Sequence, residues 1–309
     1  MDKIITIAQV IVPIFVAIFL GVAARRKAIM TPEEIQGLQK FVMNFGLPCV
    51  IFNSCLSANV GVESVGTMLM VLPFMLVSTL WAFRARKKLF PYHNLPQLFC
   101  AQETGMLGIP LFMILFGTAE AYRMGILDLT QAFTAYPTIA ILSAATDDNP
   151  SPGQIVKKVL RSPLLLMSVA GLTLNLTGLG NWLDNIGIGG ILTESTGFPA
   201  QPISAMMIFS VGYNFTMSGG NRKDILKISA IHFTAFVVIG LIVQLGLFLI
   251  PGVDALTRWS VLLFSTLPAS YLAPSLGKTE ADFQAASGVC SLLTVVSLSI
   301  FCIIAAIVA

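Results

Sequence analysis

The sequence is poor in charged residues. Only 11% of its 309 residues are Asp, Glu, Lys or Arg, whereas about 25% is typical of soluble domains. Its hydrophobic fraction is 56% and its mean hydropathy is +0.85. This composition excludes a water-soluble globular protein and predicts a membrane protein with little mass outside the bilayer. The net charge of +3 indicates no strongly basic surface, so a nucleic-acid partner is not expected.

Residues that build common catalytic and metal sites are also scarce. The chain has two His, and its five Cys form no C-x-x-C pair, so neither a zinc cluster nor a Cys–His or Ser–His signature is present. Asp147-Asp148 has no second acidic motif that would complete a diphosphate–Mg²⁺ site, and no phosphate-binding loop occurs. We therefore expect no enzyme activity, no metal ion and no organic cofactor.

Apolar segments long enough to cross a bilayer recur along the chain. A transmembrane helix needs about 20 mainly apolar residues. The first such run, 4–24, is longer than the apolar core of a signal peptide, so we expect it to be retained as a helix. Ten segments reach this length, and they are 4–24, 38–57, 64–83, 95–117, 123–145, 159–179, 199–219, 225–250, 256–276 and 283–308.

The basic residues alternate between the two sides that these spans define. The odd-numbered connections, together with the adjoining ends of the spans, contain 15 of the 18 Lys and Arg, and only Lys3, Arg123 and Arg258 fall on the other side. Cytoplasmic loops are enriched in Lys and Arg. The alternation therefore supports ten transmembrane helices and predicts that both termini are non-cytoplasmic.

A polar, Pro- and Gly-rich segment divides the chain into two halves. We expect residues 147–163 to be a cytoplasmic linker between a first five-helix repeat, 1–146, and a second, 164–309. Because five is odd, the second half enters the membrane with the opposite polarity. An inverted repeat of this kind is a common basis of secondary transporters.

Proline interrupts the fourth helix of each half, within 102–110 and 265–274. From the helical rise, these breaks lie roughly 15–22 Å into a hydrocarbon core about 30 Å thick. A proline break is tolerated there only against protein or a watery cavity. Half-helix N-termini that follow the two breaks would converge on one anionic substrate, and two ordinary proline kinks are the alternative. The candidate substrate-binding residues of these segments are Thr104, Gly105, Gly108, Pro110, Thr266, Pro268 and Ser270.

Other polar residues in the spans are also of interest. Intramembrane carboxylates are costly and mark ion or proton pathways, so Glu103, together with Gln102, is a candidate ion-coupling site; a hydrogen-bonded structural carboxyl is the alternative. Asp128 lies nearer the outer end of its helix, and we expect a solvated boundary residue. Asn44 precedes another break, Leu47-Pro48, where it would either contact substrate or bridge helices.

Several motifs follow one another along the chain with a regular order and spacing. They are Val12-Pro13-Ile14-Phe15, Leu20-Gly21, Arg25-Arg26, Leu38, Asn44, Leu47-Pro48, Ile51-Phe52, Thr104-Gly105-Met106-Leu107-Gly108-Ile109-Pro110-Leu111, Thr266-Leu267-Pro268-Ala269-Ser270 and Ala285-Ala286-Ser287 through Leu292. Their order and spacing resemble the auxin efflux carrier (PIN-like) family of membrane transporters. The resemblance implies an all-α fold of ten transmembrane helices in a 5+5 inverted repeat, whose broken fourth and ninth helices cross at the substrate site. It also implies an elevator-type movement against a scaffold that forms a homodimer.

The family's substrates are organic anions, so the resemblance implies a carrier of malonate, malate or auxin-like carboxylates coupled to H⁺ or Na⁺. The chain lacks the long cytoplasmic loop of many plant members, which favours a bacterial type in the inner membrane. Family members often have Asn near the position of Glu103. A carboxylate there would repel a dianion unless it were protonated or paired with a cation, so we expect the coupling cation at Glu103. A membrane ligand sensor with the same fold, which no longer moves its ligand, is the alternative.

Overall fold

The computed structural model describes residues 2–58, 61–143, 160–215 and 220–308. Over these residues the chain is helical, and its one β-type pairing is an isolated bridge between Gln102 and Ala269. The α-helices are α1 (Asp2–Arg26), α2 (Pro32–Phe41), α3 (Leu47–Leu56), α4 (Val62–Lys88), α5 (Leu95–Cys100), α6 (Ile109–Phe116), α7 (Ala121–Ser143), α9 (Pro163–Leu176), α10 (Leu179–Asn185), α11 (Ile188–Ala200), α12 (Ile203–Asn214), α13 (Arg222–Gly246), α14 (Ala255–Thr266) and α15 (Glu280–Val308).

Several of these helices have the length and composition of membrane spans. The helices α4, α13 and α15 are each long and apolar enough to cross a membrane. The pair α9 and α10, which is bent by 73°, would be a fourth span if it crosses as one unit. The all-helical membrane fold is therefore confirmed. Ten continuous helices are not found in the described residues, because several predicted spans are interrupted. Most of the predicted linker, 147–163, lies outside the residues that the structure describes.

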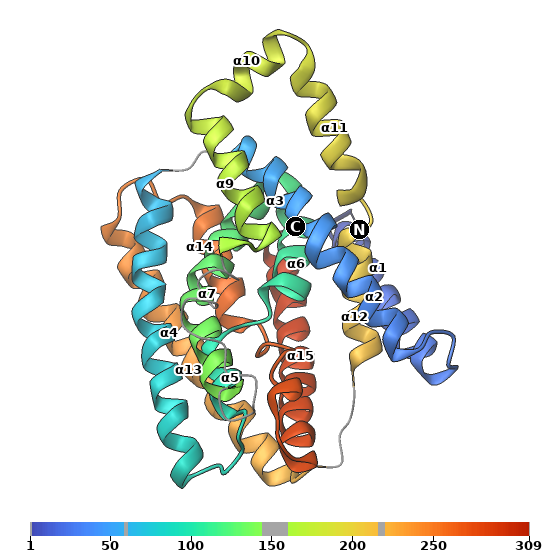
Figure 1. The fold of residues 1–309 in the computed structure, drawn as a ribbon, viewed down its shortest axis with the longest axis vertical. Coiled ribbons are helices and arrows are strands. Elements are labelled where there is room, and N and C mark those ends of the chain that lie inside the picture. Colours follow the sequence, from blue (N-terminus) through green and yellow to red (C-terminus); the bar gives the residue numbers. More distant parts are fainter. Residues whose placement is uncertain (1, 59–60, 144–159, 216–219, 309) are drawn as a thin grey trace.

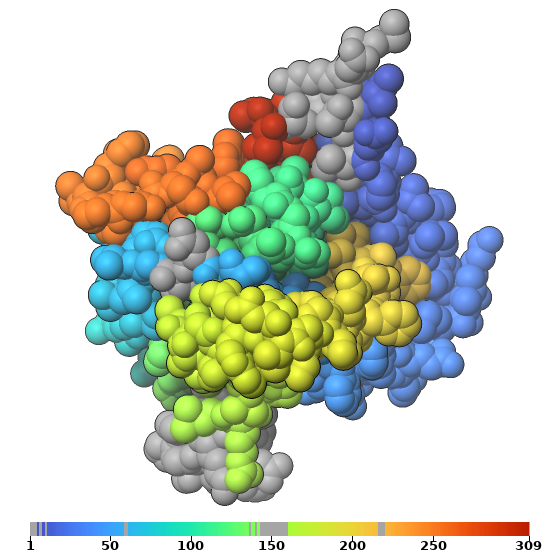
Figure 2. All heavy atoms as spheres, turned by 90° about the horizontal axis from the view of Figure 1, so that it is seen from above, coloured from blue at the N-terminus to red at the C-terminus, as the bar shows by residue number. Residues whose placement is uncertain are grey.

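The helices form two groups with the broken segments between them (Figure 1). On one side α1 packs along α12, with α2 beside them, and on the other α13 packs against α14 and α4 against α5 and α7. The helices α6 and α15 lie between the two groups, and both contact α12 or α1. The pair α10 and α11 stands at one end of the molecule, where it covers part of the face shown in Figure 2.

Proline residues are accommodated by π-helical turns at two places. The turn Val42–Gly46 leads into α3, which has Pro48 in its first turn, and the turn Thr104–Gly108 leads into α6, which has Pro110 in its first turn. Proline lacks an N–H and clashes with the carbonyl one turn back. The wider π-turn removes that clash while the chain remains helical, and such turns are frequent at functional sites.

An ion pair links α7 to the beginning of α14. Arg123, in the first turn of α7, donates to both carboxylate oxygens of Asp254 at 2.8 Å each. Asp254 is also the N-cap of α14, because its Oδ1 accepts the N–H of Thr257 at 2.8 Å. Burial alone would raise the pKa of this carboxyl, but the hydrogen bonds from Thr257 and the charge of Arg123 outweigh burial and hold the pKa below its ordinary value.

This shifted pKa predicts how the stability of the protein depends on pH. Replacing Asp254→Asn should lower the thermal unfolding temperature at pH 7, because the variant loses the ion pair. A carboxyl with a lowered folded-state pKa stabilises the fold above its unfolded pKa of about 3.9, and this contribution is lost as the pH falls through the folded value. Thermal unfolding of both proteins in detergent at pH 7 and pH 3 should therefore show a gap that narrows at pH 3. An equal gap at both pH values would contradict this account.

Candidate functional site

The two predicted breaks contact each other in the centre of the molecule. Gln102 and Ala269 form an antiparallel bridge, the N–H of Glu103 donates to the carbonyl of Pro268 at 2.8 Å, and the N–H of Ser270 donates to the carbonyl of Ala101 at 3.1 Å. The two irregular segments thus bond to each other where each leaves its helix. Backbone groups that no longer bond within a helix are satisfied across this contact.

Polar side chains of α7 satisfy other backbone groups of the first break. The amide of Gln131 accepts the N–H of Gln102 at 2.8 Å and donates to the carbonyl of the same residue at 2.9 Å. The hydroxyl of Thr134 donates to the carbonyl of Cys100 at 2.6 Å. An unpaired backbone group in an apolar interior is costly. Side chains of the neighbouring helix α7 therefore stabilise the irregular conformation of this segment.

Glu103 connects the two breaks through its carboxylate. One oxygen accepts the N–H of Tyr271 at 2.6 Å, and the other accepts the N–H of Met106, in the π-turn before α6, at 3.3 Å. The residue is 8% exposed, and the described residues include no basic partner for it. The protein's own carboxylate thus occupies the helix-terminal position that the sequence predicts for an anionic substrate.

The second predicted half-helix is not formed. The helix α14 ends at Thr266, and residues 267–279 contain only the single 3₁₀ turn Pro274–Leu276 before α15 begins. Leu267 is extended (φ −67°, ψ 154°), as expected of a residue before proline, which is disfavoured in helical conformation. The prediction that two half-helix N-termini converge is therefore wrong. Only the first break is followed by a helix N-terminus, which lies at the π-turn before α6.

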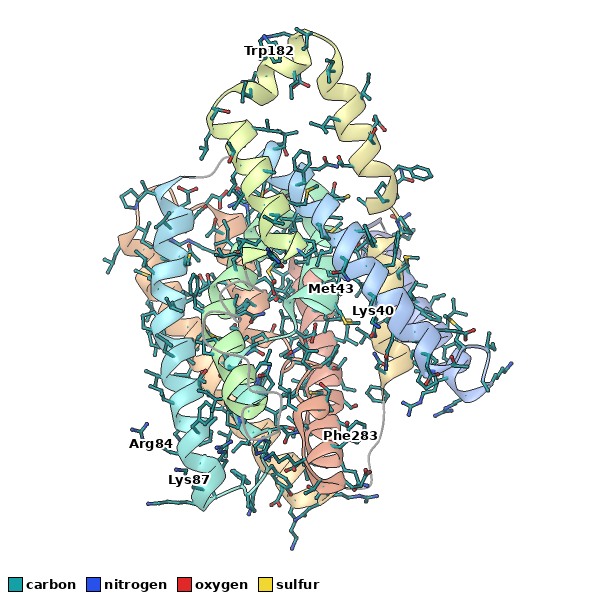
Figure 3. The ribbon with its side chains drawn as sticks, viewed as in Figure 1. Lys40, Met43, Arg84, Lys87, Trp182 and Phe283 are labelled. Carbon is teal, nitrogen blue, oxygen red and sulfur yellow. The ribbon has the colours of Figure 1, made fainter. Side chains whose placement is uncertain are left out.

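A cavity of about 430 Å³ lies beside this contact. It is partly open to the outside, and it is lined by the first break, α7, the α2 region, the end of α12 and residues 270–272. Figure 3 shows Lys40 and Met43 on the side of the α2 region that faces α6 and α15. We call it the crossing cavity, and its lining residues include Gln36, Gln39, Lys40, Met43, Asn44, Gln97, Gln102, Glu103, Gly105, Asp128, Gln131, Asn214, Ser270 and Tyr271.

Five of the ten predicted site residues line the crossing cavity, namely Asn44, Gln102, Glu103, Gly105 and Ser270. Their sequence separation is large, and only the contact between the two breaks brings Ser270 to the others. Asn44 is exposed, and its amide donates to the carbonyl of Lys40 at 2.8 Å, so it is positioned within its own helix.

The other five predicted residues surround the cavity without lining it. The hydroxyl of Thr104 donates to Asp128, and that of Thr266 donates to the carbonyl of Leu263 at 2.9 Å. Gly108 lies close to two side chains, because a Cβ there would be 2.6 Å from the terminal methyl group of Leu267 and 2.8 Å from that of Met124. Pro110 is buried in α6, and Pro268 contributes its backbone carbonyl to the contact with Glu103.

The structure corrects the prediction for Asp128 and adds Gln131. Asp128 is not a solvated boundary residue, because it accepts hydrogen bonds from Thr104 and, at 3.0 Å, from Gln131, and it lines the crossing cavity. The sequence contained a signal for this. Asp128, Gln131, Thr134 and Thr138 recur at intervals of three or four residues, so they share one face of a helix, and a polar face of a membrane helix points inward.

The crossing cavity combines acceptors and donors for a charged ligand. Its acidic residues are Glu103 and Asp128, and Lys40 is its basic residue. Two amide nitrogens, Nε2 of Gln97 and Nε2 of Gln39, are buried without a hydrogen-bond partner in the described part of the chain. In that part no three His, Cys, Asp or Glu side chains cluster as metal ligands. The arrangement can hold a monovalent cation or a proton at the carboxylates and a polar solute at the amides.

Comparison with known proteins found a similarity over slightly less than half of the chain. Residues 6–149 match the family model described as membrane transport protein. The matched segment contains most of α1 and all of α2 to α7, and therefore the first break, with Glu103 and Asp128. The match confirms the resemblance to the auxin efflux carrier (PIN-like) family and is to a family of transporters, not of enzymes. A search of curated proteins gave no match.

Proposed function

We propose, on the premise that residues 6–149 belong to the membrane transport protein family, that the chain is a secondary active transporter of small organic anions. In this proposal the anion moves by symport with H⁺ or Na⁺ across the inner membrane of a bacterial-type cell. The observation that carries it is the crossing cavity, in which two carboxylates and two unpartnered amide N–H₂ groups line the same space.

Coupling follows from the charges of the crossing cavity. Glu103 and Asp128 have no basic ion-pair partner in the described residues, and charges interact strongly away from water. An organic anion that entered would be repelled by both carboxylates. A proton or Na⁺ at Glu103, with Gln102 beside it, removes this repulsion. The anion then binds well only together with the cation, which is the requirement for symport.

The solute itself would be held by neutral donors and by Lys40. The unpartnered amides of Gln97 and Gln39 offer N–H groups to carboxylate oxygens, and Asn44 and Ser270 lie on the same cavity surface. Thr104, Gly108, Pro110, Thr266 and Pro268 would act through the backbone that they position, not through direct contact.

The proposal includes the 5+5 inverted repeat, with repeats 1–146 and 164–309, the linker 147–163 and both termini non-cytoplasmic. The bonded contact between the two breaks supports it, as does the alternation of basic residues. The cavity is bounded by α2 and α12 on one side and by α7 and the breaks on the other. This boundary fits an elevator movement in which the group that contains α4, α5, α7, α13 and α14 moves past a scaffold of the first, second, sixth and seventh spans. The scaffold would form a homodimer within the lipid bilayer.

The test is uptake into liposomes that contain the purified chain. We expect saturable uptake of labelled malonate, malate or indole-3-acetate that an imposed pH or Na⁺ gradient accelerates. Protein-free liposomes are the control. Uptake that no gradient changes would contradict cation coupling. Binding without uptake would contradict transport and would favour a ligand sensor.

A further inference from the structure

A second cavity, of about 360 Å³, adjoins the crossing cavity. Four residues line both cavities and form the wall between them, and they are Gln36, Gln39, Asn214 and Tyr271. The second cavity lies between α1, α2 and α12 on one side and α15 with residues 274–275 on the other. We call it the Arg25 cavity, after the basic residue in its lining.

The two cavities differ in charge. The crossing cavity contains two carboxylates, whereas the lining of the Arg25 cavity includes Arg25 and no acidic side chain. Arg25 has no acidic partner among the described residues. The amide nitrogen of Gln39, in the shared wall, is buried without a hydrogen-bond partner, so a donor faces this region in addition to the guanidinium.

The guanidinium of Arg25 is held in place by the backbone of α12. Its Nη1 donates to the carbonyls of Tyr213 at 3.4 Å and Phe215 at 3.3 Å, at the C-terminal end of that helix. Both carbonyls accept hydrogen bonds from Nη1, so the other N–H groups of the planar guanidinium can donate to a ligand. An arginine positioned in this way loses less freedom when it binds a carboxylate.

The opposite wall is supplied by α15 and by Tyr271. Ser287 of α15 lines the cavity, and the hydroxyl of Tyr271 lies 2.8 Å from that of Thr294. The backbone N–H of Tyr271 is held by Glu103 of the crossing cavity. Phe283, also in the lining, is at the same end of the molecule as Arg84 and Lys87 (Figure 3). This is the end that the basic residues predict to be cytoplasmic.

We propose that the Arg25 cavity is a second anion-binding site, which takes a carboxylate group of the transported solute on the cytoplasmic side of the crossing cavity. The proposal rests on the proposed function. A carboxylate in this cavity is paired with a guanidinium through charge-assisted hydrogen bonds and is separated from Glu103 and Asp128 by the wall of Gln39 and Tyr271. The coupling cation and an anion bound at this second site are then held in different cavities, and Tyr271 is one of the four residues that line both.

Malonate binding to the full-length chain in detergent, measured by titration calorimetry, tests this site. Replacing Arg25→Gln should weaken binding about tenfold or more, since it removes a charged hydrogen-bond donor. The matched control is Arg26→Gln, which removes the same charge from the next residue, outside the lining of the cavity, and should change the Kd by less than about twofold. Arg25→Lys keeps the charge and should restore part of the affinity.

A second variant avoids the bonds between Arg25 and α12. Ser275 is exposed and lines the same cavity, so Ser275→Asp adds a negative charge without disturbing them and should weaken malonate binding, whereas Ser275→Asn should not. Equal affinities of Arg25→Gln and Arg26→Gln, or no binding of malonate by the unmodified chain, would overturn the site. Binding that depends on Arg25 without uptake into liposomes would support the site and contradict transport instead.

Discussion

Replacing Gly212→Ala is expected to leave little correctly folded protein. Gly212 lies where α12 crosses α1, and a Cβ there would be 2.1 Å from the carbonyl oxygen of Ile18. Gly21, on the facing helix, is in the same situation, 2.1 Å from the carbonyl oxygen of Phe209. These neighbours are backbone atoms, so the two helices would have to separate along their contact. Overpacking of a core costs about 1–3 kcal/mol where side chains can move, and we expect a larger cost here.

The measurement is the thermal unfolding temperature in detergent, together with the monodisperse fraction in size-exclusion chromatography. A loss of more than about 3 kcal/mol corresponds to a decrease of roughly 5 °C for a chain of 309 residues. Gly37→Ala is the matched control, because Gly37 is also helical and a Cβ there would meet nothing within 4 Å. Equal unfolding temperatures of the two variants would show that α1 and α12 do not pack as closely as described.

Replacing Glu103→Gln is expected to abolish the acceleration of malonate uptake by an imposed cation gradient. The variant removes the negative charge that the coupling cation would neutralise. It also changes the contact between the breaks, because the carboxylate accepts the N–H groups of Tyr271 and Met106. Glutamine has a single acceptor oxygen, so its NH₂ would face one of these two donors. We therefore expect slower uptake as well as uptake that no longer responds to the gradient.

The comparison requires a control that removes a carboxylate elsewhere. Glu33→Gln serves, because Glu33 is exposed in the first turn of α2 and is not in the lining of either cavity. Uptake is measured in liposomes under the same pH and Na⁺ gradients, with binding measured separately in detergent. An unchanged response to the gradient in Glu103→Gln would assign coupling to another group and leave Glu103 a structural acceptor.

The sequence predicts correctly that the fourth and ninth helices are interrupted near a proline. It also predicts a helix after each break, but the structure has a helix only after the first. Proline interrupts a helix because of its own chemistry, so Pro110 and Pro268 could be recognised without a structure. The conformation of the chain after a break depends on the partners of the freed backbone groups. After Gly108 the chain returns to a helix, and after Leu267 it does not, because residues 268–270 bond to residues 101–103 instead.

Asp128 shows the limit of judging a residue by its position along a helix. Its predicted depth placed it near the membrane boundary, but the side chain accepts hydrogen bonds from Thr104 and Gln131 beside the break. Depth is a property of one helix, whereas these contacts join two helices. The polar face of α7 was present in the sequence, but the backbone groups that it satisfies could be identified only from the packing.

The sequence by itself determined the membrane-protein class, the resemblance of residues 6–149 to a membrane transport family, the positions of the proline residues and the presence of a carboxylate, Glu103, within an apolar span. Each of these depends on the residue's own chemistry, such as a missing N–H group or the cost of a charge in hydrocarbon. The tertiary structure decided which groups meet. Glu103 accepts a hydrogen bond from a residue 168 positions away, and Arg25 reaches carbonyls 188 and 190 positions away. Such contacts depend on how helices cross, which local sequence does not specify, and they create both cavities.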